Sequence, residues 1–240
     1  MAIHNSTPAA SITFATADTV VSGFGPLNDE LTRLATASAV GETTTNAGLA
    51  FVTGGAGLAI SVGGTSHTLR LALRDKTAAQ LEKDGRVVLA TMGVSQGTVD
   101  AFYGNPNLSP TDKAIIVDAL QHLGTTSGRE IFVAGASQAQ SIEMGFFYRR
   151  QAELIAGFDK KVAPVHAFVR MGAAPMLETG KGTISILPDY LFWSPPLEGL
   201  VAGARSGQLW ITGRASPMAT SQLAALGWTI VPKAGAQLGQ

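Results

Sequence analysis

The sequence predicts a protein of the α+β or α/β class, in which an N-terminal antiparallel β meander packs on a C-terminal α/β region with βα units. Three observations support this prediction. Residues 11–24 and 68–74 alternate apolar and polar side chains, which is typical of half-buried strands. Residues 86–92 and 131–134 are continuously apolar, which is typical of strands covered on both faces. Residues 209–231 follow the order strand, helix, strand and predict a βαβ unit.

The first 75 residues form the predicted β-rich region. A short helix is expected over residues 26–38, and a hairpin over residues 49–62 around a Gly-Gly-Ala-Gly turn. Residues 47–64 carry no charge and approach the length of a membrane span. They include six glycines, which are poor helix formers, so no membrane contact is expected.

The remaining chain, residues 76–240, forms the predicted α/β region. The clearest helix start lies at Ser109, because serine, proline and aspartate occupy the N-cap, N1 and N3 positions. No Pro- or Ser-rich linker separates residues 1–75 from residues 76–240, so both also fit one continuous domain. The helices expected are 77–83, 109–122, 138–156, 197–205 and 217–226, and the strands are 86–92, 131–134, 165–171, 183–187, 209–212 and 228–231.

The composition points to association. The chain has 240 residues, of which 17 are basic and 17 acidic, so its formal charge is zero. Charged residues make up 14% of the chain, against about 25% in an ordinary soluble domain. The mean hydropathy is +0.21, and cysteine is absent. This composition excludes a disordered chain, a disulfide scaffold and a cysteine nucleophile. The balanced charge gives no electrostatic footprint for nucleic acid. The low charge favours burial of surface between subunits.

A pattern of glycine, apolar run, second glycine and serine occurs three times in the C-terminal region. If the three apolar runs were parallel strands, the serines would lie on one rim beside helix N-termini, where anions bind. The simpler interpretation is three ordinary βα turns, each with a capping serine. The candidate ligand-binding residues are Gly93, Ser95, Gly135, Ser137, Gly213 and Ser216.

The segment GASQA at residues 135–139 lies between a predicted strand and a predicted helix. It resembles the nucleophile elbow of the α/β-hydrolases, with Ala139 in place of the last glycine. The resemblance implies Ser137 as nucleophile, His166 as base and Asp159 as acid, because these are the only His after Ser137 and the only Asp between them. A helix cap explains Ser137 equally well.

No cofactor and no metal site are predicted. The segment FVTGGAG at residues 51–57 resembles the start of a short-chain dehydrogenase loop, but Ile60 replaces the third glycine and no helix follows. The four histidines are far apart in sequence and show no metal-ligand spacing.

The leading hypothesis is therefore a structural, self-associating protein, such as a virion (phage) or bacterial assembly component. Its expected partners are copies of itself and other assembly proteins. No signal peptide is recognised in residues 1–10, so a virion or the cytoplasm is the expected location. Tyr190, Phe192 and Trp193 are the expected interface anchors, since aromatic residues dominate contact energetics. The alternatives are an α/β enzyme, most specifically the serine hydrolase, and a binding module for an anionic small ligand.

Overall fold

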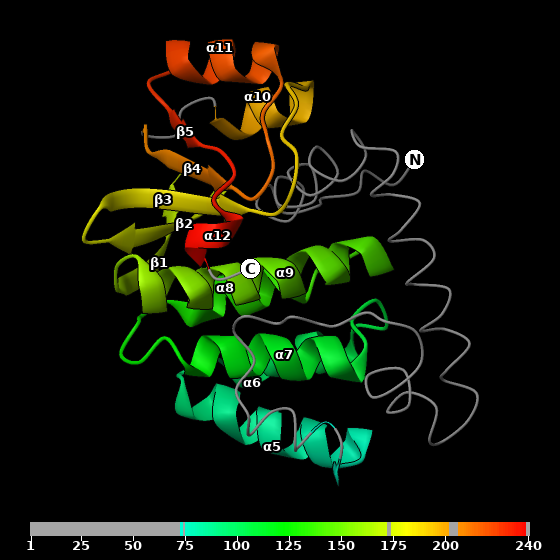
Figure 1. Ribbon diagram of the computed structural model, residues 1–240. Coiled ribbons are helices and arrows are strands. Elements are labelled where there is room, and N and C mark those ends of the chain that lie inside the picture. Colours follow the sequence, from blue (N-terminus) through cyan, green and yellow to red (C-terminus); the bar gives the residue numbers. More distant parts are fainter. Residues whose placement is uncertain (1–72, 74, 172–173, 202–205, 239–240) are drawn as a thin grey trace.

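The computed structural model describes Leu73 and residues 75–171, 174–201 and 206–238 (Figure 1). These residues form helices and one mixed five-stranded sheet, so the mixed α+β class is confirmed. The predicted N-terminal β meander lies outside the described residues, apart from Leu73. It comprises the strands 11–24 and 68–74, the helix 26–38 and the hairpin 49–62.

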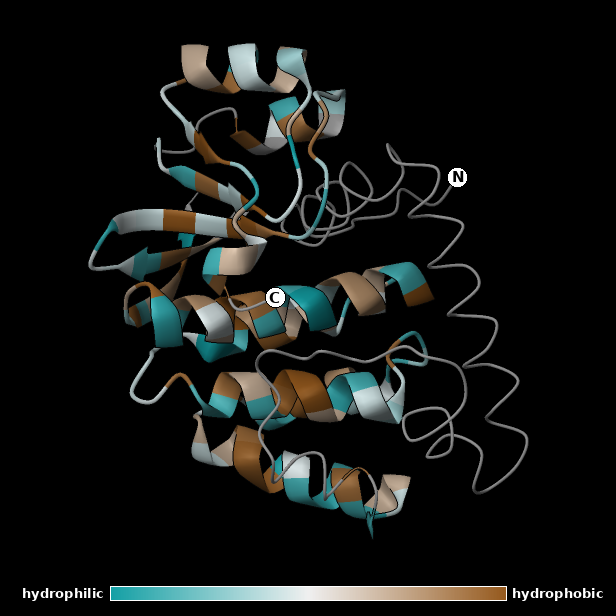
Figure 2. Cartoon of the chain, in the orientation of Figure 1, coloured by the Kyte–Doolittle hydropathy of each residue, from teal (hydrophilic) through white to brown (hydrophobic). Residues whose placement is uncertain are grey.

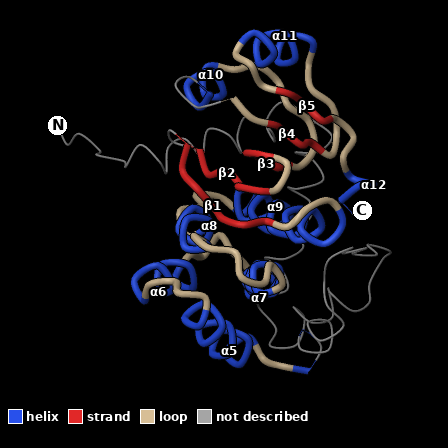
Figure 3. Tube along the Cα trace, turned by 90° about the vertical axis from the view of Figure 1, so that its left-hand side faces the viewer, coloured by secondary structure: helices blue, strands red, loops and turns tan. Residues whose placement is uncertain are grey.

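Residues 76–161 form the helical region. Its helices lie in layers, with α5 outermost, α6 and α7 next, and α8 and α9 against the sheet (Figures 1 and 3). The bounds are α5 (Ala78–Thr91), α6 (Gln96–Gly104), α7 (Pro110–Gln121), α8 (Arg129–Ala136) and α9 (Ile142–Lys161).

Residues 165–238 form the sheet region, whose strands are arranged in chain order. The first three strands are antiparallel, and the last three are parallel. The parallel strands are joined by α10 and α11, which lie on the face of the sheet opposite α8 and α9 (Figure 3). The bounds are β1 (Val165–Met171), β2 (Ala174–Thr179), β3 (Gly182–Leu187), α10 (Pro195–Val201), β4 (Gln208–Ile211), α11 (Pro217–Ala225), β5 (Thr229–Val231) and α12 (Gly235–Leu238).

The predicted strand at residues 86–92 is wrong, because residues 86–91 belong to α5 and Met92 is the C-cap of that helix. The helix starts with a capping box, in which the side chains of Thr77 and Gln80 each bind the other's backbone N–H. Leu89 is fully buried whereas Val87 is 61% exposed, so the apolar run turns one helical face inward. A short apolar run has the same appearance in a buried strand and in a buried helix, and the cap upstream decides between them here.

The predicted strand at residues 131–134 is also wrong, because these residues lie in α8. Gly128 precedes the helix in a left-handed conformation with a φ of 70°, and Phe132 and Val133 fill the core beneath it. Gly135, predicted to turn the chain, lies within α8 against the ring of Tyr148. The predicted helix 138–156 is present as α9, but it begins at Ile142 and ends at Lys161.

Other predictions are confirmed by the structure. Helix α7 begins at the Ser109 capping box, with its hydroxyl accepting from the Asp112 N–H at 3.1 Å. The β4–α11–β5 unit is parallel, and β1 and β3 form where expected. Strands β1 and β3 are not directly joined, because the unpredicted strand β2 pairs with both. The short helices α6 and α12 were not predicted either.

One apolar core joins the two regions. It extends from Leu89 in α5 to Leu238 in α12 and surrounds α9. Phe158 of α9 is fully buried and meets Trp210 of β4 edge to face, with ring centroids 5.1 Å apart. Earlier in α9, the side-chain amide of Gln151 donates to the carbonyl of Ile186 in β3 at 2.8 Å. The sheet is therefore fixed to the helical region by both apolar and polar contacts.

Candidate functional site

The serines of the predicted rim occupy three different positions relative to helices. Ser95 precedes α6, and its hydroxyl donates to the carboxylate of Glu130 in α8. Ser137 follows α8, and its hydroxyl donates to the carbonyl of Ala134 at 2.8 Å. Ser216 caps α11 by accepting from the N–H of Ala219, the third residue of that helix, at 3.1 Å. Each hydroxyl already has a structural partner.

The three apolar runs are not three parallel strands, so that basis for a common rim is wrong. Gly93 has a φ of 78° and ends α5, and Gly135 lies inside α8. Only the third segment keeps the predicted geometry, with Gly213 two residues after the end of β4 and Ser216 at the start of α11. Binding of an anion by these residues stays a prediction.

Ser137, His166 and Asp159 lie on three different elements. His166 is an exposed residue of β1, and Asp159 of α9 accepts from the Val165 N–H at 2.8 Å. Among the described residues, no hydrogen bond joins any two of the three side chains. The chain before Ser137 is a helix, so the strand that an elbow requires is missing. Their catalytic roles stay predictions.

The aromatic loop after β3 is partly buried. Tyr190, Phe192 and Trp193 are each intermediate in exposure, and Trp193 packs against the main core. Leu191 between them is fully buried, and its backbone N–H donates to the carbonyl of Arg214 at 2.9 Å. The loop is thus anchored to the chain after β4, and its role as an interface stays a prediction.

The loops that follow the three parallel strands are bonded to one another, and we call them the carboxyl edge (residues 188–194, 212–216 and 232–234). The Gly213 N–H donates to the carbonyl of Asp189 at 2.9 Å, and the Lys233 N–H donates to the carbonyl of Gly213 at 2.8 Å. Asp189 and Lys233 have positive φ values, 62° and 55°, which within the described chain no other non-glycine residue shows. Such backbone strain persists only where surrounding contacts fix it, as these bonds do.

Two acidic side chains, Asp189 of this edge and Glu153 of α9, both lie near Arg150. The backbone N–H of Asp189 donates to the Thr212 hydroxyl at 2.7 Å, but no hydrogen bond reaches its carboxylate from the described residues. Burial raises the pKa of Asp189, and the nearby Arg150 partly offsets that rise. Arg150 also donates to Glu153 at 3.0 Å, whose side chain is 6% exposed and whose Oε1 has no hydrogen-bond partner among the described residues. Burial thus favours the protonated form of the Asp189 carboxyl, and the three side chains include no nucleophile.

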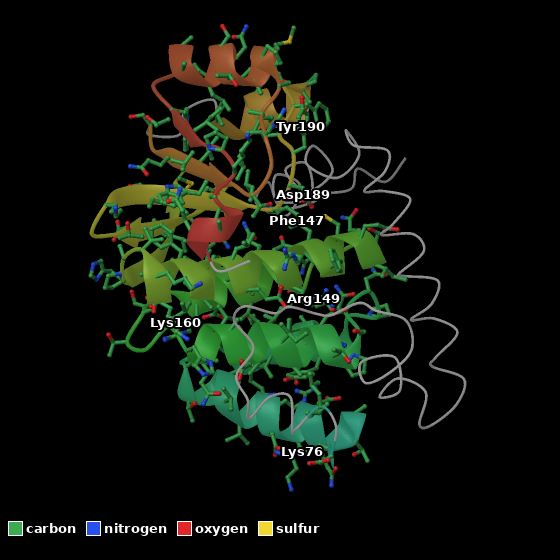
Figure 4. All side chains as sticks on the ribbon, viewed as in Figure 1. Lys76, Phe147, Arg149, Lys160, Asp189 and Tyr190 are labelled. Carbon is green, nitrogen blue, oxygen red and sulfur yellow. The ribbon has the colours of Figure 1, made fainter. Side chains whose placement is uncertain are left out.

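Two arginines on neighbouring positions of α9 serve different contacts. Arg149 lies on the side of α9 opposite Asp189, toward α7 (Figure 4), and donates to Asp112 of that helix at 3.1 Å. Its guanidinium also covers the ring of Phe146 at 4.4 Å. Both arginine side chains are at most 28% exposed, so this basic pair does not form a solvated face of the helix.

The outer helix of the sheet region carries an uncharged surface. Helix α11 contains no charged residue. Met218 within the helix is 61% exposed, and Leu226 at its C-cap is 47% exposed. Arg214 is the only charged residue among residues 206–231. Figure 2 shows α11 largely in pale shades, whereas α5 alternates hydrophilic and hydrophobic residues. This surface is not among the sequence-predicted sites, although the charge-free stretch after Arg214 was a usable signal.

Comparison of the chain with protein-family models, with curated proteins and with solved structures gives no match. None of the described helices has the combined length and apolar character that crossing a membrane requires. The described residues contain no group of three or more His, Asp or Glu side chains placed to hold a metal ion.

Proposed function

We propose that the chain is a structural, self-associating protein that serves as a component of a virion (phage) or of another bacterial assembly. The low charged fraction, the zero net charge and the positive mean hydropathy support it, because such a surface favours contact with other subunits over solution as a monomer.

The observation that carries the proposal is the uncharged outer surface of the β4–α11–β5 unit. Large exposed apolar side chains without nearby charges mark contact sites in soluble proteins. Met218 and Leu226 provide two such side chains within one helix and its cap, and residues 215–231 provide no charge to solvate them. By contrast, Val87 on α5 is equally exposed at 61% but lies near Lys83, Asp84 and Arg86.

The test is the native mass of the full chain by light scattering on a sizing column, with negative-stain microscopy of the same peak. We expect a species well above 24.7 kDa that forms ordered particles. A monodisperse monomer across the whole concentration range would overturn the proposal.

A fluorophosphonate probe separates this proposal from the hydrolase alternative. We expect no covalent label on Ser137, because its hydroxyl is held by a helix carbonyl and neither His122 nor His166, the two histidines that the structure describes, bonds to it. Labelling of Ser137 that disappears in Ser137→Ala and His166→Ala would favour an enzyme instead.

A further inference from the structure

We propose that a proton on Asp189 keeps the first loop of the carboxyl edge (residues 188–194) bonded to the other loops of that edge, and that loss of this proton as the pH rises opens the loop. The switch consists of two carboxyls that share one arginine. They belong to Asp189 of the loop and Glu153 of α9, and the arginine is Arg150 of α9. This switch goes beyond the proposed self-association and does not depend on it.

The first step is the charge of this cluster. Arg150 donates to Glu153 at 3.0 Å, and the side chain of Glu153 is only 6% exposed. The charge of Arg150 also acts on Asp189. One guanidinium neutralises one carboxylate, so ionisation of both carboxyls leaves a negative charge uncompensated in a place with little water. The cluster is therefore neutral when it holds one carboxyl proton.

The second step is the position of that proton. Glu153 accepts from Arg150, whereas no hydrogen bond from the described residues reaches the carboxylate of Asp189. Burial raises the pKa of Asp189, and the charge of Arg150 offsets only part of this rise. The contacts of the two carboxyls thus place the proton on Asp189 and the negative charge on Glu153.

The other charged groups around the loop leave Asp189 uncompensated. Arg149, the neighbour of Arg150 on α9, lies on the opposite side of that helix and donates to Asp112 (Figure 4). Helices α11 and α12 carry no charged residue. The remaining charged residues of the described neighbouring elements are Glu198 of α10, Arg214 after β4 and Lys233 after β5. Among all these described groups, Arg150 is the one whose charge lowers the pKa of Asp189.

The third step links the proton to the loop, because Asp189 is also the residue that bonds the loop to the chain after β4. Its N–H donates to the Thr212 hydroxyl at 2.7 Å, and its carbonyl accepts from the Gly213 N–H at 2.9 Å. These bonds fix its strained φ of 62°. An ionised Asp189 gains water only by leaving this half-buried position, and we expect that movement to break both bonds.

The direction of the switch follows from the two states of the loop. In the open loop the Asp189 carboxyl meets water and keeps its ordinary pKa of 3.8, whereas burial in the closed loop raises the pKa. The closed loop is therefore most favoured below the ordinary value and loses that advantage as the pH rises through the raised pKa. Tyr190, Phe192 and Trp193 lie in this loop, so the pH sets how far these predicted interface anchors are exposed.

Hydrogen–deuterium exchange of the full chain, read by mass spectrometry, tests the switch. We expect the protection of residues 188–194, corrected for the pH dependence of intrinsic exchange, to fall several-fold between about pH 4 and pH 7. Strand β3 (Gly182–Leu187) has no titratable side chain and is the internal reference, because global unfolding would expose it as well. Asp189→Asn cannot ionise and tolerates the left-handed backbone, so its loop should stay protected over the whole range.

Glu153→Gln tests whether Arg150 is shared. When residue 153 is neutral, Arg150 can neutralise an ionised Asp189 inside the closed loop, so the fall in protection should become smaller. Glu178→Gln, at an exposed glutamate of β2, is the matched control and should keep the wild-type profile.

Two outcomes would overturn the switch. The first is the same pH profile for the wild-type chain and Asp189→Asn. The second is an unchanged wild-type profile in Glu153→Gln, because Arg150 would then not be shared. Native mass enters neither outcome, so the switch and the proposed function fail separately.

Discussion

The helical region and the sheet region complete their surfaces in different ways. Every ion pair that joins two described residues lies in the helical region, between Lys76 and Glu153. The sheet region is held instead by its ladders, by the bonded loops of the carboxyl edge and by apolar contacts. Arg86 illustrates the first mode, since it donates to Glu82 and Asp100 and covers the ring of Tyr103. The difference teaches that the charges are concentrated on one side of the molecule.

The two regions nevertheless share a core, and this limits how independent they are. Helix α9 contacts α7 on one side and β3 on the other. Gly157 lets the backbone of α12 approach so closely that any Cβ would overlap the Leu238 carbonyl. We therefore expect the described chain to unfold as one cooperative unit.

The largest expected effect comes from Phe158→Ala, which removes the ring between α9 and β4. We expect a loss of about 4 kcal/mol in the free energy of unfolding, because the ring is fully buried against Trp210. All three tryptophans lie in the sheet region, so urea unfolding followed by fluorescence reports that region. Circular dichroism at the helical minimum reports mainly the helical region.

Both probes should shift by the same amount if the core is shared. A shift seen in fluorescence alone would mean that the regions unfold separately. Phe146→Ala on the same helix is the control, since that ring is only partly buried and should cost clearly less.

The next largest effect is expected for Arg129→Met, which tests the dependence of the helical region on charge. Arg129 is 7% exposed and donates to the carbonyls of Leu120, Gly124 and Thr126. Its loss removes a charged donor from each of these three carbonyls in a buried place, so we expect a cost of about 3 kcal/mol in chemical denaturation. Arg86→Met, at an exposed ion pair, should cost under about 1 kcal/mol. Equal costs would contradict this account.

The sheet region was easier to predict than the helical region. Strand β4 and helix α11 were found because Pro217, Gly227 and short apolar runs mark their limits. The apolar runs inside α5 and α8 were mistaken for strands, because four to seven apolar residues do not show a period. For α5 the local signal was the capping box at Thr77, and Gly85 lies within that helix beneath the hydroxyl of Tyr103 instead of turning the chain.

The candidate site was harder to predict than the fold. The three repeated serines share a sequence pattern but not a place, because Ser95 and Ser137 follow helices and Ser216 follows a strand. The strain at Asp189 has no strong sequence signal, since it arises from bonds to Thr212 and Gly213 far along the chain. The uncharged surface of α11 left a signal in the absence of charge over residues 215–231, but the exposure of Met218 required the structure.

A smaller effect is expected for Ser216→Ala, which tests whether the sheet region depends on this helix cap. Its hydroxyl accepts from the Ala219 N–H, and loss of an N-cap costs about 1 kcal/mol. Thermal unfolding at several scan rates measures the change. Ser95→Ala is the comparison, since Ser95 makes no side-chain cap and instead donates to Glu130. An unchanged Ser216→Ala protein would show that α11 is held by its apolar face alone.

The smallest expected effect is a difference in pH dependence between one aspartate in each region. Burial raises the pKa of Asp189 above its ordinary 3.8, so the fold favours the protonated form. Its contribution to stability is therefore present below that value and is lost as the pH rises through the folded pKa. Asp189→Asn should gain stability relative to the wild-type chain as the pH rises toward neutral. Asn tolerates the left-handed backbone, so strain does not change.

Asp100 in the helical region should respond with the opposite sign. Hydrogen bonds from Arg86 and Gln96 lower the pKa of Asp100, so its contribution is present above the ordinary value and is lost as the pH falls through the folded pKa. Asp100→Asn should therefore be less stable than the wild-type chain at neutral pH and approach it in acid. Urea midpoints of both variants between pH 3 and pH 7 measure the two slopes. We expect opposite signs because desolvation dominates at Asp189 and hydrogen bonding dominates at Asp100. Slopes of the same sign would contradict this difference in environment between the two aspartates.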